Sequence, residues 1–199
     1  KKDAYRLEVY RAMNWDEVGH IERAQRHLES HVSLALADKC IDEVVLIQLH
    51  LARGLISPGR NAECITQVAW TLRLARTNAL RLRENALYRI AASAYGEMGD
   101  SARVQRSHAK AIQIGGELGM RSVTGVSWAR LSTNERAAGR YGNAIRYADI
   151  ALSVLGDSSS ARETTQARLA KYIPHVWLQT EEVARIGQKM SSWMRDEEG

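Results

Sequence analysis

The most regular pattern in the chain is a glycine that returns at one fixed interval between stretches of apolar residues at helical spacing. Gly19, Gly59, Gly99 and Gly139 share this register, and each is followed by a polar or charged residue. A glycine after one apolar stretch and a polar residue before the next are typical of a short turn between two helices. The pattern therefore predicts helix-turn-helix units that repeat with the spacing of these glycines.

Small or apolar residues follow each turn at two fixed distances. Residues four apart lie on one face of a helix, and small side chains there let two helices approach closely. The first position, five residues after the glycine register, holds Ala24, Cys64, Val104, Ala144 and Ala184, and the second holds Leu28, Val68, His108, Ala148 and Gln188. This face is expected to pack against the first helix of the same unit.

Five units of two helices each follow from this register, at about residues 1–40, 41–80, 81–120, 121–160 and 161–199. The expected helices are 3–17 and 20–37, 40–56 and 60–77, 80–98 and 101–117, 120–138 and 141–155, and 160–178 and 180–195. Pro58 falls in a turn. Pro174 falls inside the helix 160–178, which it is expected to kink or break.

The third and fourth units carry the clearest version of the repeat. The third has Tyr88, Ala91, Ala92, Tyr95, Gly99, Asp100, Val104 and Ala111, and the fourth has Trp128, Leu131, Gly139, Tyr141, Ala144, Ala148 and Ala151. This order of large, small, aromatic and turn residues resembles the tetratricopeptide repeat. The resemblance implies an all-α, right-handed α-solenoid that forms a single domain over residues 1–199. The period of 40 exceeds the family's usual length of about 34, which longer helices and an extended turn between units would explain.

Repeats of this length are similar to those of bacterial transcriptional regulators and peptide-pheromone receptors, and also to those of eukaryotic polarity scaffolds. The sequence does not single out one of these groups. In such solenoids the first helices line a concave groove, so the resemblance implies that ligand-binding residues lie there. The positions that correspond to the groove include Leu49, Arg53, Ile56, Arg89, Ser93, Thr133 and Arg136.

The three arginines among these positions suggest the chemistry of a ligand. An arginine can bind a carboxylate through two parallel hydrogen bonds, so the groove is expected to suit a peptide with an acidic residue or a free C-terminus. The alternative is that each arginine pairs with a glutamate of the same protein.

Composition changes this interpretation little. The chain is 45% hydrophobic, lacks phenylalanine and has a net charge of +5. The densest basic run, Arg73, Arg76, Arg81, Arg83 and Arg89, invites a nucleic-acid alternative, but aromatic residues able to stack on bases are missing from it. Nucleic acid is therefore not expected to bind through this domain.

Two cysteines in 199 residues do not indicate a disulfide framework, so we expect a cytoplasmic location. The chain has neither a signal region nor a long apolar run, so no membrane contact is expected. Because it starts without methionine, it looks like a fragment of a longer protein.

No enzyme motif occurs, so neither catalysis nor a cofactor is expected. His27 and His31 have the i, i+4 spacing of metal ligands, with His20 nearby. No acidic residue or cysteine at an obvious distance completes the set, so no metal site is expected.

Our main hypothesis is a protein- or peptide-binding module that forms the regulatory or sensor part of a bacterial cytoplasmic regulator. The alternative is a structural scaffold or oligomerisation module. In that alternative Trp177, Trp193 and Met194 contact a second copy in a homodimer, because exposed aromatic residues at the end of a solenoid mark such contacts.

Overall fold

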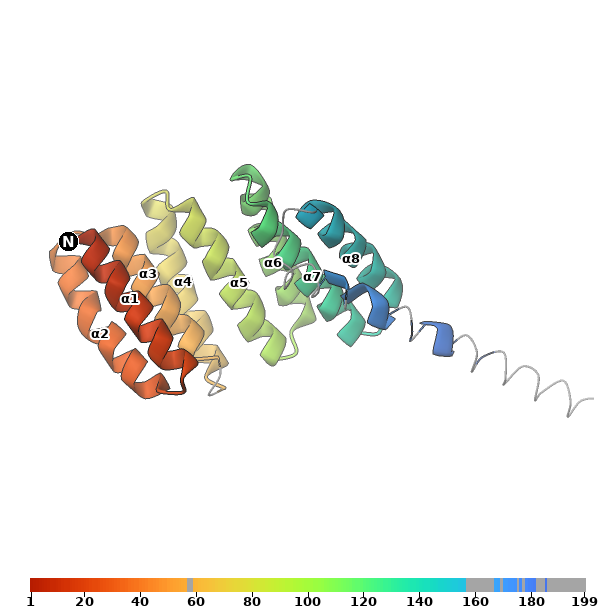
Figure 1. The fold of residues 1–199 in the computed structure, drawn as a ribbon, viewed down its shortest axis with the longest axis horizontal. Coiled ribbons are helices and arrows are strands. Elements are labelled where there is room, and N and C mark those ends of the chain that lie inside the picture. Colours follow the sequence, from red (N-terminus) through yellow and green to blue (C-terminus); the bar gives the residue numbers. More distant parts are fainter. Residues whose placement is uncertain are drawn as a thin grey trace, which may run out of the picture. The chain divides into compact units, whose positions relative to one another are not determined.

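The computed structural model describes residues 1–56 and 59–156, and after these 167–168, 170–174, 176, 178–181 and 185. Helices and short turns make up this part of the chain, as predicted (Figure 1). The helices are α1 (Lys2–Glu17), α2 (Ile21–Ala37), α3 (Ile41–Gly54), α4 (Asn61–Thr77), α5 (Arg81–Glu97), α6 (Ser101–Glu117), α7 (Arg121–Ala137) and α8 (Tyr141–Leu155). The all-α prediction and the order of these helices are confirmed.

The turns share one backbone conformation, which occurs both within and between the repeat units. The residue at positions 19, 39, 59, 79, 99, 119 and 139 has a positive φ, and the next amide donates to the carbonyl five residues before it, as in His20 to Trp15 at 2.8 Å. This is the Schellman arrangement, in which a left-handed residue ends a helix. Two of the seven positions hold residues other than glycine, Lys39 with φ 56° and Ala79 with φ 54°.

The extended turn expected between units is absent from this part of the chain. The links 38–40, 78–80 and 118–120, which join successive units, have the same length as the links 18–20 and 98–100 within units. The long period comes from the helices, since most of them have 17 residues. Two such helices and their two short turns together account for the whole period.

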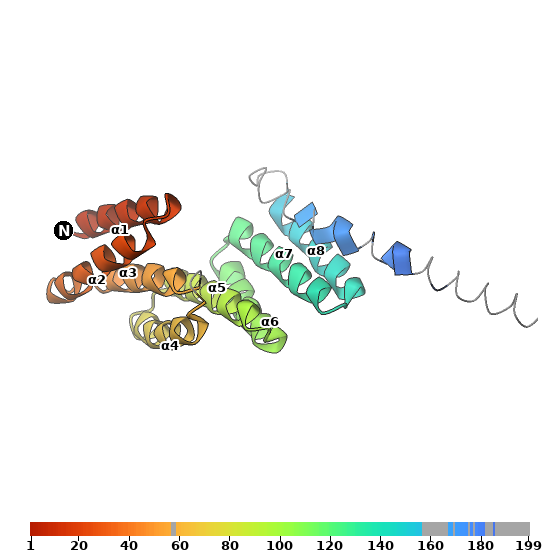
Figure 2. The ribbon, with the colours of Figure 1, turned by 90° about the horizontal axis from the view of Figure 1, so that it is seen from below.

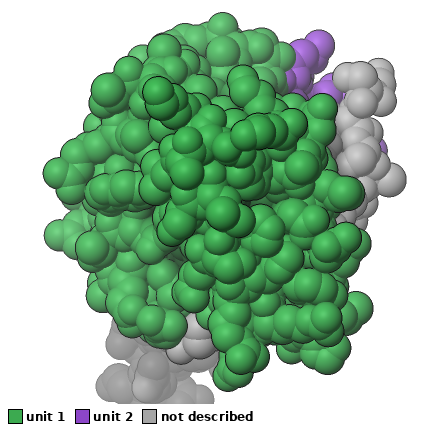
Figure 3. All heavy atoms as spheres, turned by 90° about the vertical axis from the view of Figure 1, so that its left-hand side faces the viewer, with its two compact units in different colours: residues 1–120 green, residues 121–199 purple. Residues whose placement is uncertain are grey.

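The chain divides into two compact units, residues 1–120 and 121–199, which are described separately (Figure 3). The expectation of a single domain over residues 1–199 stays a prediction. No helix among the described residues is both long and apolar enough to cross a lipid bilayer.

In residues 1–120 each helix packs against the next, and α3 also contacts the first helices on either side of it, α1 and α5 (Figure 2). Helix α3 is consequently buried on two sides. Val44, Ile47 and Leu51 belong to a core with α1 and α2, whereas Val45 and Leu49 belong to a core with α4 and α5. Burial on two sides explains why the run from residue 44 to 49 is almost continuously apolar.

The small positions predicted on the second helices lie inside. The first set, Ala24, Cys64, Val104 and Ala144, has exposed fractions between 0% and 5%, and the second set, Leu28, Val68, His108 and Ala148, between 0% and 6%. The predicted packing face of the second helices is therefore confirmed for the described repeats. His108 is a core histidine, as its position predicts.

Helices α7 and α8 are in close contact at Gly125. A Cβ atom placed there would stand 2.5 Å from Leu155 Cγ, so the side chain of Leu155 on α8 occupies the space beside Gly125 on α7. Pro174 is buried, and the residues described on both sides of it, Lys171–Ile173 and Val176, are helical. The expected kink or break at Pro174 stays a prediction.

Candidate functional site

Two adjoining depressions cross the surface formed by α2, α3 and α4. One has a volume of about 770 Å³ and the other about 410 Å³, and both are open to solvent. They share Gln48, Glu63 and Gln67, so we treat them as one surface and call it the α2–α4 furrow. Its further lining residues are Gln25, Glu29, Val32 and Ser33 of α2, Leu51 of α3 with Leu55 at its end, and Arg60, Ala62, Thr66, Trp70 and Arg73 in or beside α4.

Amide side chains from three helices form the polar part of the furrow. Gln67 of α4 donates a hydrogen bond to Gln48 of α3. Gln25 of α2 donates to the carbonyl of Gly54 at 3.2 Å. An amide side chain offers two donor hydrogens and an oxygen that accepts twice, so each glutamine keeps capacity for another partner. The furrow therefore presents amide groups whose orientation is already fixed.

An ion pair forms one part of the wall of the α2–α4 furrow. Arg60 donates to Glu63 at 2.8 Å and 2.5 Å, a bidentate pair within one helical turn. The hydrogen bond from Arg60 lowers the pKa of Glu63, against the opposing effect of desolvation. Because the two charges satisfy each other, this part of the wall has little net charge to offer a ligand.

Trp70 stands on the rim of the larger depression with 45% of its surface exposed. Tryptophan carries a large apolar area and few rotatable bonds, which makes it a frequent anchor in protein interfaces. Val32, Leu51 and Leu55 add apolar surface at the smaller depression. The furrow thus combines fixed amide groups with apolar contacts.

The groove residues predicted on α3 and just after its end do not line one common site. Leu49 is a correction: it is 8% exposed and lies in the core with α4 and α5, because α3 is packed on two sides. Ile56 is half-buried against the same core. Arg53 is exposed and lines a notch of about 30 Å³ together with Asp16 and His50. That notch has room for about one water molecule, so it does not admit a peptide.

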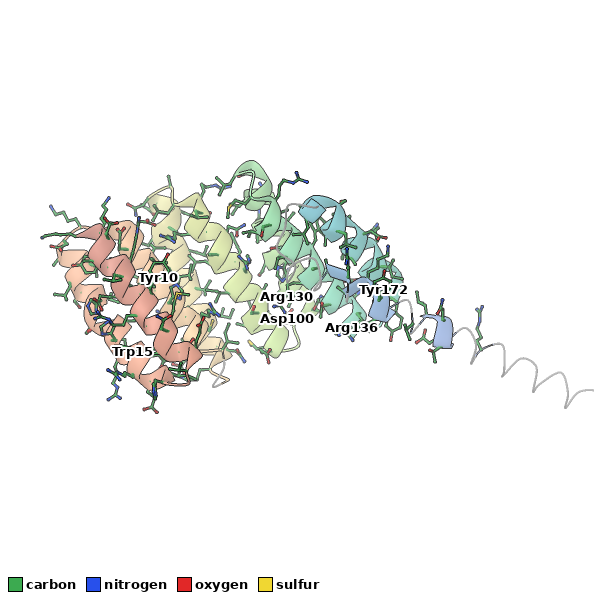
Figure 4. The ribbon with its side chains drawn as sticks, in the orientation of Figure 1. Tyr10, Trp15, Asp100, Arg130, Arg136 and Tyr172 are labelled. Atoms are coloured by element: carbon green, nitrogen blue, oxygen red, sulfur yellow. The ribbon has the colours of Figure 1, made fainter. Side chains whose placement is uncertain are left out.

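The other predicted residues lie on α5 and α7. Arg89 is half-buried, and Ser93 donates its hydroxyl to the Arg89 carbonyl at 3.2 Å. Thr133 and Arg136 belong to residues 121–199, and Figure 4 places Arg136 near the C-terminal end of α7. The Thr133 hydroxyl donates to the Ala129 carbonyl at 3.2 Å. Both hydroxyl hydrogens are therefore engaged within their own helices.

Three of the five arginines in the basic run form ion pairs with acidic neighbours. Arg76 and Arg81 lie 3.7 Å and 3.2 Å from Glu84, and Arg81 also pairs with Glu117. Arg83 binds Asp42 at 2.7 Å. Arginines that are already paired with carboxylates neutralise few phosphates, so they contribute little to nucleic-acid affinity through counterion release. This arrangement argues against nucleic-acid binding through the run.

The furrow residues Gln48, Gln67 and Trp70 were not among the predicted site residues. Trp70 carries a signal in the sequence, because it falls between the core positions Val68 and Thr71 and out of phase with them. A large aromatic residue on the outward face of an amphipathic helix is worth examining as a contact residue. The two glutamines carry no such signal.

Both cysteines of the chain lie in the first unit. Cys40 and Cys64 are both free and buried, and burial raises the pKa of the Cys64 thiol to about 11. A thiol with so high a pKa is a poor nucleophile.

Trp177, Trp193 and Met194, predicted to contact a second copy, lie outside the residues whose side chains are described.

No family model matches the sequence, and no curated protein matches it. Several solved structures share the fold. BtubC (BKLC) from P. vanneervenii matches with a TM-score of 0.66 and 18% identity over 77% of this chain, which spans 64% of the length of BtubC. A putative kinesin light chain from Podosopora anserina with nearly identical TPR-like repeats matches with a TM-score of 0.67 and 16% identity, over 96% of this chain and 98% of that one. The fold is therefore a TPR-like α-solenoid, as predicted.

Proposed function

We propose that this chain is a protein-interaction module that binds a peptide segment of a partner in the α2–α4 furrow. The observation that carries the proposal is Trp70, an exposed aromatic side chain on the rim of an open depression of about 770 Å³. The predicted site on the first helices has less support, because Leu49 is buried and Arg53 lines a notch too small for a peptide.

The furrow suits a peptide in an extended conformation. The backbone of such a peptide has free N–H and C=O groups, which the amides of Gln25, Gln48 and Gln67 can meet. An apolar peptide side chain gains most against Trp70, where burial removes the largest apolar area from water. The hydrogen bonds that these glutamines already make within the protein lower the entropy lost on binding.

The finer part of the proposal concerns the parent protein. We propose that binding in the furrow acts as the sensor step of a cytoplasmic regulator, with the output in another domain. The repeats throughout the chain support a binding role, and the lack of enzyme motifs in the sequence supports a role without catalysis. The resemblance to the repeats of bacterial transcriptional regulators is the support for this choice of regulator.

A selection of peptides displayed on phage, followed by affinity measurements with synthetic peptides, tests the proposal. Trp70→Ala and Gln48→Ala are expected to weaken the selected peptides by about tenfold or more, the usual cost of removing an interface anchor. Leu82→Ala is the matched control, because Leu82 is also large, apolar and 51% exposed but lies on α5, outside the furrow. Its affinity should equal that of the wild type.

An Arg53→Ala, Arg89→Ala double variant separates the two candidate surfaces. Unchanged affinity in this variant supports the furrow. Loss of affinity in it, with the Trp70→Ala variant binding normally, would move the site to the first helices. Failure to select any peptide on the folded protein would contradict peptide binding altogether.

A further inference from the structure

Three metal-ligating side chains converge between α1 and α2, and none of them lines the α2–α4 furrow. Glu8 lies on α1, and His27 and His31 lie one turn apart on α2. Glu8 Oε2 is 2.8 Å from His27 Nε2, and the two imidazole rings have their centroids 4.4 Å apart. One donor atom from each of the three residues lies within 4.8 Å of the other two. We call this group the Glu8–His27–His31 cluster.

The hydrogen bond of His31 to its own helix leaves one of its ring nitrogens available. His31 Nδ1 lies 2.8 Å from the carbonyl oxygen of His27. A carbonyl oxygen accepts and cannot donate, so Nδ1 carries the proton and Nε2 keeps its lone pair. A histidine that binds a metal commonly uses its second nitrogen in this way, with a backbone carbonyl fixing the tautomer and the ring.

Neighbouring side chains fix the His27 ring as well. Trp15 meets it edge to face, with the centroids 5.0 Å apart and the planes at 79°. The Arg23 guanidinium covers the Trp15 ring at 4.2 Å. Packing of this kind holds a ligand in place before the ion arrives, which reduces the entropy cost of binding.

Arg11 is the competing partner of Glu8. Its Nη1 lies 2.9 Å from Glu8 Oε2, but its side chain is 53% exposed. Such a surface pair contributes about 0–1 kcal/mol in general, whereas a bond to a divalent ion is much stronger. Arg11 can therefore turn toward solvent when an ion binds.

We propose that the Glu8–His27–His31 cluster binds a divalent transition-metal ion, with zinc as the best fit. Two imidazoles and one carboxylate are the ligands that zinc takes in sites with three protein ligands and a water at the fourth position. Nitrogen donors exclude magnesium and calcium as preferred ions. The ion takes the place of the hydrogen bond between His27 and Glu8 and draws the donors to tetrahedral spacing.

The bound ion links the two helices of the first repeat. Glu8 comes from α1 and both histidines come from α2, so coordination holds the helices together at about half their length. An ion that binds the folded chain more tightly than the unfolded one stabilises the fold by mass action. Zinc is therefore expected to raise the melting temperature of the protein.

The test is calorimetric titration of the whole chain with zinc chloride, repeated with cobalt chloride and visible absorption to report the coordination geometry. The wild type should bind one ion. His31→Gln and His27→Gln should each weaken binding by about tenfold or more, and Glu8→Gln should do the same, because each removes one of three ligands. His20→Gln is the matched control, since His20 is exposed at the start of α2 and outside the cluster.

Circular dichroism shows whether each variant is folded before it is titrated. His31→Gln is the safest variant, because the hydrogen bonds of its ring lie within its own helix. Binding that is absent in the wild type, or that is equal in His31→Gln and the wild type, overturns the proposal. A loss of binding in His20→Gln as large as in His31→Gln would place the ion elsewhere on α2 and overturn it too.

Discussion

Arg83 of α5 donates two hydrogen bonds to Asp42 of α3, at 2.7 Å and 3.2 Å, and so joins the N-terminal ends of two successive first helices. Arg6 of α1 reaches the same carboxylate at 3.5 Å. One acidic residue thus links three repeats. The contact spans 41 residues of sequence but lies in one structural register.

This contact predicts a stability that depends on pH. The hydrogen bond from Arg83, opposed by desolvation, holds the pKa of Asp42 below its usual 3.8. Folding then favours the ionised form, so the contact stabilises the protein above about pH 3.8 and its contribution is lost as the pH falls through the lower folded-state pKa. Asp42→Asn should cost about 1 kcal/mol at pH 7, and the difference from the wild type should shrink below pH 4.

Urea unfolding at a series of pH values measures that difference. Asp3→Asn is the control, because the Asp3 side chain is 99% exposed and its change should be within about 0.5 kcal/mol at every pH. A cost for Asp42→Asn that stays constant from pH 7 to pH 3 would contradict the prediction.

The contact of Gly125 with Leu155 predicts that a methyl group added at position 125 strongly destabilises the protein. Gly125→Ala places a Cβ 2.5 Å from Leu155 Cγ and 3.3 Å from the Ala151 carbonyl oxygen, and Leu155 is fully buried. Relief requires α7 and α8 to move apart, so the free energy of unfolding should fall by about 2–3 kcal/mol.

Gly142→Ala is a matched control for Gly125→Ala. Gly142 lies in α8, and nothing stands within 4 Å of a Cβ placed there. The helix propensity of alanine should then raise stability by about 0.5–1 kcal/mol. Opposite signs for the two substitutions, measured by urea unfolding, are the expected result, and equal signs would be inconsistent with it.

Replacement of Lys39 or Ala79 by glycine is expected to stabilise the protein. Both residues hold the left-handed conformation that glycine occupies at the other turns, with φ of 56° and 54°. A side chain costs about 1 kcal/mol there, so Lys39→Gly and Ala79→Gly should each raise the midpoint of thermal unfolding. Gly59→Ala, at φ 76°, should lower it by the reverse argument. No change in the midpoint for either glycine variant would show that these turns are not strained.

Removal of the buried carboxylate of Glu135 is expected to lower the free energy of unfolding. It is fully buried and accepts hydrogen bonds from Arg140 at 2.7 Å and 2.8 Å and from Asn143 at 3.1 Å, across the turn between α7 and α8. Glu135→Ala leaves both donors without this acceptor and should cost about 2–3 kcal/mol. The exposed Glu97→Ala on α5 should cost far less, and a similar cost for both would refute the role of Glu135.

Much of the fold could be predicted from the sequence because the signals are local. A turn glycine and a small or apolar residue five positions later mark each of the four described helix pairs. The turns at Lys39 and Ala79 were harder to recognise, since neither residue favours a positive φ. Their geometry nevertheless matches that of the glycine turns, because the same backbone hydrogen bond occurs at every turn between the described helices.

The site depends on contacts between helices, which the sequence encodes weakly. Counting positions along one helix predicts Leu49 in the groove, but α4 and α5 on its other side bury it. Glu8 lies 19 residues before His27, a separation that no short metal motif covers. Antiparallel pairing about the turn at residues 18–20 brings the two together, so the pair could be anticipated only after the helices were paired.

The uniform turns have a consequence for how such a chain can grow. Because every link between the described helices has a left-handed residue at its next-to-last position, the gain or loss of one helix with its turn would fit the local geometry at either end. It would nevertheless exchange first and second helices in every unit that follows, so the small residues of the second helices would no longer stand at the positions that pack inside. Duplication of a whole pair of helices preserves this order, so such a chain is expected to gain or lose helices two at a time.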